Sequence, residues 1–171
     1  MKIGIDARLI NETGVGRYIR NLIRELALID SQNTYVVFVR KNADFDPPNS
    51  RFAKRVADVP WHSIREQMVM PFVFLKERLD ILHVPYFNAP IFYPGKFMVT
   101  IHDLTILHFD TGRATTLPLP FYKLKRLGYW LELAIGLRRA KKIIAVSETT
   151  KQEILDHFDI LPEKIDVIYE G

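Results

Sequence analysis

The sequence predicts an α/β protein with a doubly wound, mainly parallel sheet. Short apolar runs that suit buried strands alternate with longer segments whose apolar residues recur every three or four positions, as on one face of a helix. Strands that alternate with helices in this way pair in parallel. The 171 residues are enough for one domain with a sizeable core.

The first strand and helix are the clearest. Residues 2–7 suit a short buried strand, and from Val15 to Leu26 the apolar positions follow one helical face. The β-branched and aromatic residues at 34–39 predict a second strand, and residues 52–59 predict a third, at an edge of the sheet.

The later part of the chain repeats the alternation. Residues 64–79 predict a helix interrupted at Pro71, because proline lacks the N–H that an interior helix position needs. Ser147 suits the N-cap of a helix over 148–158. The remaining predicted elements are strands within 80–85, 96–103, 140–146 and 163–171 and a helix from about 118 to 139.

Composition excludes several classes of protein. With no cysteine, the chain has no disulfide, thiolate metal site or cysteine nucleophile. No His, Asp and Glu cluster has metal-ligand spacing, so we expect no metal. The longest apolar run, Met68 to Leu75, is far shorter than the ~20 residues that span a bilayer, and Asp6 and Arg8 interrupt any signal peptide. We therefore expect a cytoplasmic protein.

The net charge of +4 is concentrated in one part of the chain. Residues 121–151 contain eight basic and two acidic residues. This charge could attract anionic lipid, nucleic acid or a phosphorylated substrate, and a solvated helix face explains it equally well. Of these partners we expect peripheral contact with an anionic membrane through 121–142, and no nucleic acid.

Two glycines precede the first helix. Gly14 and Gly16 begin a G-x-G-x-x-G dinucleotide motif, but Ile19 stands where the third glycine belongs. Arg40 and Lys41 follow the second strand in place of the acidic residue that binds a ribose. The glycines still allow close backbone approach, and the helix N-terminus attracts an anion or a sugar oxygen. A plain tight turn is the alternative interpretation.

Polar residues follow several predicted strands at the edge where α/β sheets bind ligands. His102 and Asp103 could present an imidazole and a carboxylate to substrate hydroxyls. The other positions at this edge are Asp6, Ala7, residues 83–88, Ser147 and Glu148.

The remaining histidines are weaker candidates. His83 lies inside an apolar run and is expected to be packed and hydrogen-bonded rather than catalytic. His62, His108 and His157 have no chemical partners nearby in the sequence. Residues 84–90, VPYFNAP, combine aromatic rings with an amide and suit either a sugar or a lipid-linked acceptor. The alternative interpretation is a loop that only fills space in the fold.

Five blocks in order resemble a known family. They are GIDARLI…TGVGRYIRNLIREL, DILHVPYFNAP, TIHDL, RRAKKIIAVSETTKQEI and KIDVIYEG. Together they resemble the amino-terminal, Rossmann-like domain of retaining glycosyltransferases of family 4, group 1, which have the GT-B fold. The resemblance is strongest to mannosyltransferase-like enzymes of cell-envelope polysaccharide or glycolipid synthesis.

This resemblance implies how the chain works. Residues 1–171 form a single acceptor-side domain, and a second domain binds most of a GDP- or UDP-linked sugar, a co-substrate rather than a cofactor. It places Gly14, Val15, Gly16 and Arg17 against the donor, and His102, followed by Asp103, beside the donor sugar. We assign the acceptor side to Tyr86, Asn88, Ser147 and Glu148.

One departure from the family limits the expected activity. The Glu-x7-Glu motif of the donor domain is absent, because no two glutamates lie eight positions apart. We therefore expect little transfer activity without a second domain, in the same parent chain or in a separate subunit. The alternatives are a catalytically silent module that binds glycans or membranes and, third, an independent dinucleotide-binding domain.

Overall fold

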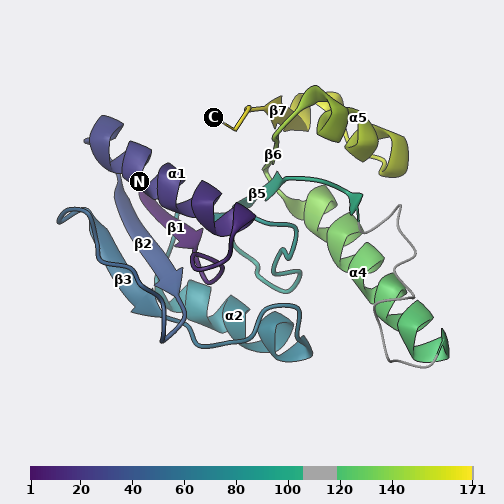
Figure 1. Ribbon diagram of the computed structural model, residues 1–171, viewed down its shortest axis with the longest axis horizontal. Helices are drawn as coiled ribbons and strands as arrows, with labels where there is room; N and C mark the ends of the chain where they lie inside the picture. The colour runs from purple at the N-terminus through teal and green to yellow at the C-terminus, as the bar shows by residue number, and fades with distance from the viewer. Residues whose placement is uncertain (106–118, 171) are drawn as a thin grey trace.

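The computed structural model describes residues 1–105 and 119–170, with side chains except at 119–126. Its centre is a parallel seven-stranded sheet in the order β3-β2-β1-β4-β5-β6-β7 (Figure 1). The predicted α/β, doubly wound fold is confirmed. The strands are β1 (Lys2–Asp6), β2 (Thr34–Val39), β3 (Phe52–Val56), β4 (Ile81–Val84), β5 (Phe97–Ile101), β6 (Lys142–Ala145) and β7 (Ile165–Val167). The helices are α1 (Gly14–Ile29), α2 (Ile64–Lys76), α4 (Leu119–Arg139), α5 (Glu148–His157) and the short 3₁₀ helix η2 (Pro162–Lys164).

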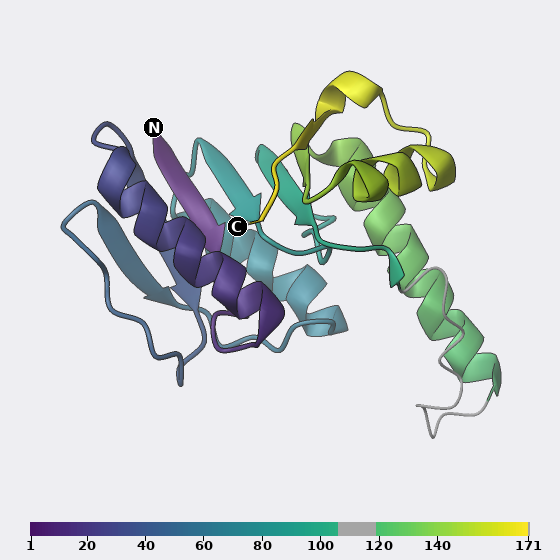
Figure 2. The same cartoon turned by 45° about the horizontal axis from the view of Figure 1, so that its top comes forward.

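The sheet separates two hydrophobic cores, one on each of its faces. Helix α1 lies on one face of the sheet and α2 on the other (Figures 1 and 2). Ile19 and Ile23 of α1 pack in the first core, whereas α2, α4 and α5 contribute to the second. Strand β2 serves both cores, since its residues are buried alternately in one and the other. A strand buried on both faces explains the continuous apolar run in its sequence.

Helix α2 continues through Pro71, so the predicted interruption there was wrong. Pro71 is buried together with Met70 and Phe74, and this packing outweighs the cost of a proline inside the helix. Ser63 caps the helix by accepting the N–H of Glu66 at 3.1 Å.

Other boundaries agree closely with the sequence. Ser147 caps α5 as predicted, accepting the N–H of Thr150 at 3.0 Å. Strand β3 is an edge strand that ends at Val56, before the predicted 59. Helix α4 ends at Arg139 as expected, while residue 118 lies outside the described residues. Within 1–105 and 119–170 no helix is long and apolar enough to cross a membrane.

Candidate active site

A cleft of about 380 Å³ lies at the carboxyl ends of the central strands. Residues that follow β1, β3, β4 and β5 meet there with the first turn of α1. Leu9, Glu12, Thr13, Gly14, Val15, Trp61, Tyr86, His102, Asp103 and Glu170 line it. The cleft therefore gathers His102, Asp103, Tyr86, Gly14 and Val15 from the predicted site.

His102 is held on several sides at the end of β5. Its Nε2–H donates to the carbonyl of Pro85 at 2.9 Å, which fixes the ring orientation. The ring of Tyr18 meets it edge-on, with centroids 5.0 Å apart. The Thr150 hydroxyl of α5 donates to the His102 carbonyl at 3.3 Å. With Nε2 occupied, Nδ1 is left to face the cleft.

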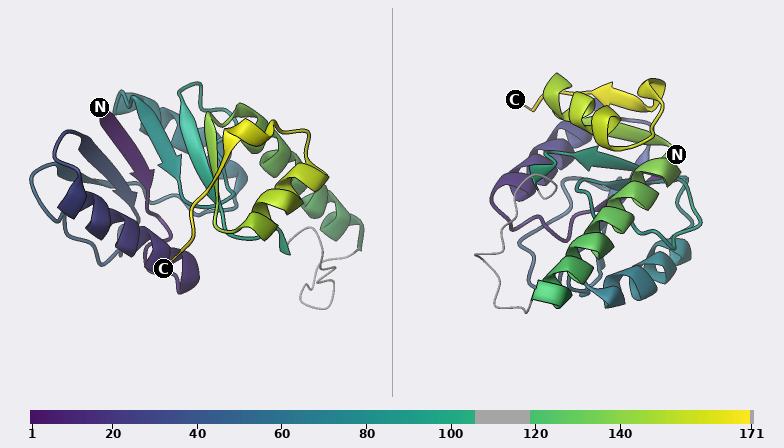
Figure 3. Two further views of the ribbon diagram at one scale, coloured as in Figure 1. Left: turned by 90° about the horizontal axis from the view of Figure 1, so that it is seen from above. Right: turned by 90° about the vertical axis from the view of Figure 1, so that its right-hand side faces the viewer.

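Glu170 is the partner of that nitrogen and was missed by the sequence reasoning. Its Oε1 lies 2.6 Å from Nδ1 of His102, so the contact holds a proton on either the imidazole or the carboxyl. Figure 3 shows the last described residues running from β7 toward the side of the sheet where α1 lies, and Glu170 lines the same cleft as Gly14 and Val15. Nothing local in the sequence signals this contact, since it depends on the path of the chain after β7.

Aromatic rings form another wall of the cleft. Trp61, also absent from the predicted site, is partly exposed beside Tyr86. His62 lies 5.0 Å from the ring of Phe87 and 5.3 Å from that of Tyr129. The fold brings aromatic residues of three segments around His62, a packing arrangement that the sequence did not indicate.

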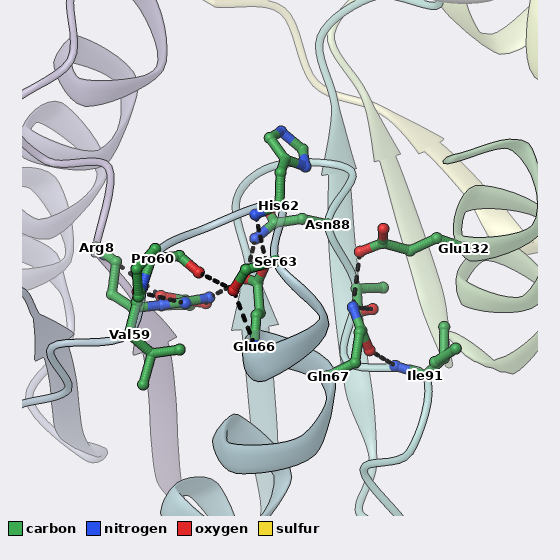
Figure 4. Close-up of polar contacts among 12 residues, drawn as sticks. Arg8, Val59, Pro60, His62, Ser63, Glu66, Gln67, Asn88, Ile91 and Glu132 are labelled. Carbon is green, nitrogen blue, oxygen red and sulfur yellow. Dashed lines mark hydrogen bonds and ion pairs between the residues drawn. The ribbon is translucent and has the colours of Figure 1, made fainter. Parts of the chain in front are cut away.

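A buried polar network supports this wall from below (Figure 4). Arg8 donates two hydrogen bonds to Asp6, at 2.8 and 2.6 Å, and pairs with Glu66 of α2. Glu66 also accepts the side-chain amide of Asn88 at 2.6 Å and the backbone N–H of His62 at 2.7 Å. Since His62 has a left-handed φ of 55°, Glu66 holds Trp61 and its neighbour in a strained turn.

Burial raises the pKa of Glu66, and the adjacent Arg8 opposes the rise. Next along α2, Gln67 donates to the carboxylate of Glu132 on α4 at 2.7 Å and accepts the N–H of Ile91 at 2.9 Å. Burial, together with the charge of Glu66, raises the pKa of Glu132 to about 7. The contacts of Gln67 join α2, α4 and the loop after β4.

The two glycines have different roles, and neither lies in a loop. Both belong to the first turn of α1, which begins at Gly14 rather than near Val15. A Cβ on Gly16 would lie 2.6 Å from the carbonyl oxygen of Ile10, so this glycine is required for packing inside the protein. A Cβ on Gly14 would meet nothing within 4 Å. Gly14 is therefore the glycine that a ligand can approach.

Some predicted site residues lie elsewhere. Asn88 is buried, with its amide nitrogen bound to Glu66. The Ser147 hydroxyl caps α5, and the exposed Glu148 and Arg17 do not line the cleft. His83 is packed as expected, sharing a hydrogen bond with Thr100 at 2.8 Å, and burial lowers its pKa to about 4.

Comparisons with known proteins identify the family and agree with the fold. The family described as Glycosyltransferase Family 4 matches residues 13–171, and the chain belongs to that family. The lipopolysaccharide outer core galactosyltransferase WaaB in its apo form has a similar structure, with a TM-score of 0.56 and 14% identity over 100% of this chain and 46% of that one. A glycosyltransferase from Rickettsia africae ESF-5 gives a TM-score of 0.56 and 18% identity, over 99% of this chain and 42% of that one.

These similarities define the class of the protein. It is a family 4 glycosyltransferase domain with a Rossmann-like fold, corresponding to one half of a GT-B glycosyltransferase. The chain spans less than half the length of either similar structure. Comparison with the sequences of curated proteins finds no match.

Proposed function

We propose that the chain is the acceptor-binding half of a retaining glycosyltransferase that uses a nucleotide-diphosphate sugar. The observation that carries this proposal is the cleft itself. In a family 4 domain, it joins the α1 N-terminus, the His102 and Asp103 pair and an aromatic wall at one edge of the sheet. Parallel α/β sheets bind ligands at this edge.

In the proposed reaction, the protein orients the reactants and stabilises the charge that develops on them. The acceptor oxygen bonds to the anomeric carbon on the face from which the diphosphate departs, as the carbon–diphosphate bond breaks. A leaving-group oxygen takes the acceptor proton. His102 and Asp103 orient sugar hydroxyls at the cleft, and the exposed first turn of α1 at Gly14 directs backbone N–H groups toward the donor phosphates. Glycosidase-type paired carboxylates are not required.

The donor side belongs to a second domain in this proposal, in the same parent chain or in a separate subunit. We propose a GDP- or UDP-linked sugar, with mannose as the first candidate, and an acceptor of polysaccharide or glycolipid synthesis that is a sugar or is lipid-linked. Copurification from the native lysate identifies the second domain. Labelled GDP-mannose and UDP-sugars are then assayed with the two-domain enzyme.

His102→Ala is the variant for that assay and His157→Ala, outside the cleft, is its control. We expect transfer with the wild-type enzyme and with the control, and a loss of at least roughly tenfold with His102→Ala. Equal activity of all three would overturn the role of the cleft. A short chain that occurs alone and transfers no sugar would favour the silent binding module.

A second candidate function is contact with an anionic membrane. Leu127, Leu131 and Ile135 are exposed along one side of α4, and Arg138 is exposed on the same helix. Apolar side chains beside basic ones suit a lipid surface. In the described part of 121–142, two of the basic side chains already have partners within the protein. Arg139 donates to the carbonyls of Ile91 and Tyr93, and Lys142 pairs with Asp166.

Flotation with vesicles tests this contact. Binding that requires anionic lipid and falls with added salt supports it, whereas equal binding to neutral vesicles contradicts it. Leu131→Ser is the informative variant, and Leu28→Ser, exposed on α1, is the control.

A further inference from the structure

The charge of the cleft is opposite to that of the whole chain. The net charge of the sequence is +4. Among the described residues, however, the cleft lining includes the carboxylates of Glu12, Asp103 and Glu170 and no lysine or arginine. Among the described lining residues, only His102 can carry a positive charge, and its Nδ1 lies 2.6 Å from Glu170. The proton between them leaves this pair without net charge, so Glu12 and Asp103 supply the excess negative charge.

The residues below the cleft do not reverse this charge. A smaller pocket beneath it is lined by Asp6 and Arg8 together with Trp61 and Tyr86. The guanidinium of Arg8 is paired with the carboxylates of both Asp6 and Glu66, so its charge is already balanced within the protein. An acceptor that approaches Glu12 and Asp103 therefore meets an excess of negative charge, while the proposed function places the donor phosphates at the backbone N–H groups of the first turn of α1.

The cleft also offers the surfaces that bind sugar rings. Trp61 and Tyr86 line it with aromatic side chains, and carboxylate oxygens accept hydrogen bonds from hydroxyl or ammonium groups. An ammonium group gains further from the faces of nearby aromatic rings. A phosphate or carboxylate on the acceptor would instead lie close to the carboxylates of Glu12 and Asp103.

We propose that the acceptor subsite on this domain selects a sugar without negative charge, and that it favours a protonated amino sugar over a neutral sugar of the same shape. This inference rests on the proposed function for the location of the acceptor. Glu12 and Asp103 are its specificity-determining residues, and Trp61 supplies the surface on which the ring stacks.

The test is an NMR titration of the 171-residue chain with three oligosaccharides. The β-linked glucosamine trimer and cellotriose differ by an ammonium group in place of one hydroxyl on each ring, and trigalacturonate is the anionic probe. The two tryptophans give a built-in reference, because Trp61 lines the cleft while Trp130 lies on α4 beside Phe158. The indole N–H signal of Trp61 should therefore move and that of Trp130 should stay.

We expect the glucosamine trimer to bind roughly three- to tenfold more tightly than cellotriose at low ionic strength, with trigalacturonate the weakest. The preference should shrink as salt is added, because the cleft is open to solvent. Glu12→Gln should reduce the preference for the glucosamine trimer over cellotriose. Glu25→Gln, an exposed carboxylate near the other end of α1, should leave it unchanged.

The outcomes separate the two proposals. Equal affinities for the glucosamine trimer and cellotriose, or tight binding of trigalacturonate at the Trp61 signal, would overturn the charge selection and leave the acceptor site standing. If none of the three sugars moves the Trp61 signal, both this inference and the location of the acceptor are overturned.

Discussion

Arg8, just after β1, and Glu66, in the first turn of α2, form an ion pair that is almost completely excluded from solvent. The pair joins the segment after β1 to helix α2. Because Glu66 also accepts the N–H of His62, the same contact fixes the loop that presents Trp61. The stability of the domain and the shape of the cleft therefore depend on one network.

Arg8→Met should destabilise the domain severely. It leaves the carboxylates of Asp6 and Glu66 buried without their cation, which costs about 3 to 5 kcal/mol in comparable sites. Urea unfolding gives this difference. Arg24→Met removes an exposed ion pair and should change the free energy of unfolding by less than about 1 kcal/mol. Similar losses in the two variants would contradict the structural role of Arg8.

Gly16→Ala should weaken the fold, whereas Gly14→Ala should not. The new methyl group at 16 would press on the carbonyl oxygens of Ile10 and Leu9, at 2.6 and 2.9 Å, and we expect a loss of about 1 to 3 kcal/mol. The methyl group at 14 enters open space and removes a flexible glycine from a helix. Thermal unfolding of the two variants measures the contrast.

Variants at Gly14 and Gly16 also distinguish a role in donor binding from a role in packing. In a two-domain enzyme, we expect Gly14→Ala to weaken donor binding, because the first turn of α1 borders the cleft. Unchanged donor affinity in this stable variant would remove Gly14 from the donor site. Gly16→Val, by contrast, is expected to reduce donor binding through damage to the loop before α1.

His102→Ala should lower kcat in the two-domain enzyme more than it raises the KM of the acceptor. The imidazole is held by Pro85 and Glu170 at the cleft, where it can stabilise the donor sugar as charge develops. Steady-state kinetics with each substrate varied give the two constants. Equal changes in both would assign His102 to general binding instead.

Glu132 should make stability fall as the pH rises from about 4.5 to about 7. Burial raises its pKa in the folded protein to about 7, above the ordinary 4.5 that applies after unfolding. The folded state consequently binds more protons in this window, and the free energy of unfolding decreases with pH. Because Glu132 is partly exposed, the effect should not exceed about 2 kcal/mol.

Glu132→Gln is the matched test of this pH dependence. Glutamine can still accept the hydrogen bond from Gln67 but cannot ionise, so the variant should exceed the wild type in stability above about pH 7 and equal it near pH 4. Urea unfolding across this range shows the difference. Glu163→Gln, an exposed position on η2, should follow the wild type at every pH.

The sequence by itself determined the order of strands and helices, the parallel sheet, the end of β5 as the place of His102 and Asp103, and the family. The first three depend on local periodicity and on the residue types that follow strands, whereas the resemblance of five ordered sequence blocks indicated the family. Tertiary structure alone brought Glu170 to His102, placed Trp61 in the cleft, closed Arg8 onto Glu66 and turned Gly16 into an internal packing position. It also carried α2 through Pro71. Each of these depends on contacts between segments far apart in the chain, where the free energy of burial and pairing overrides local preference.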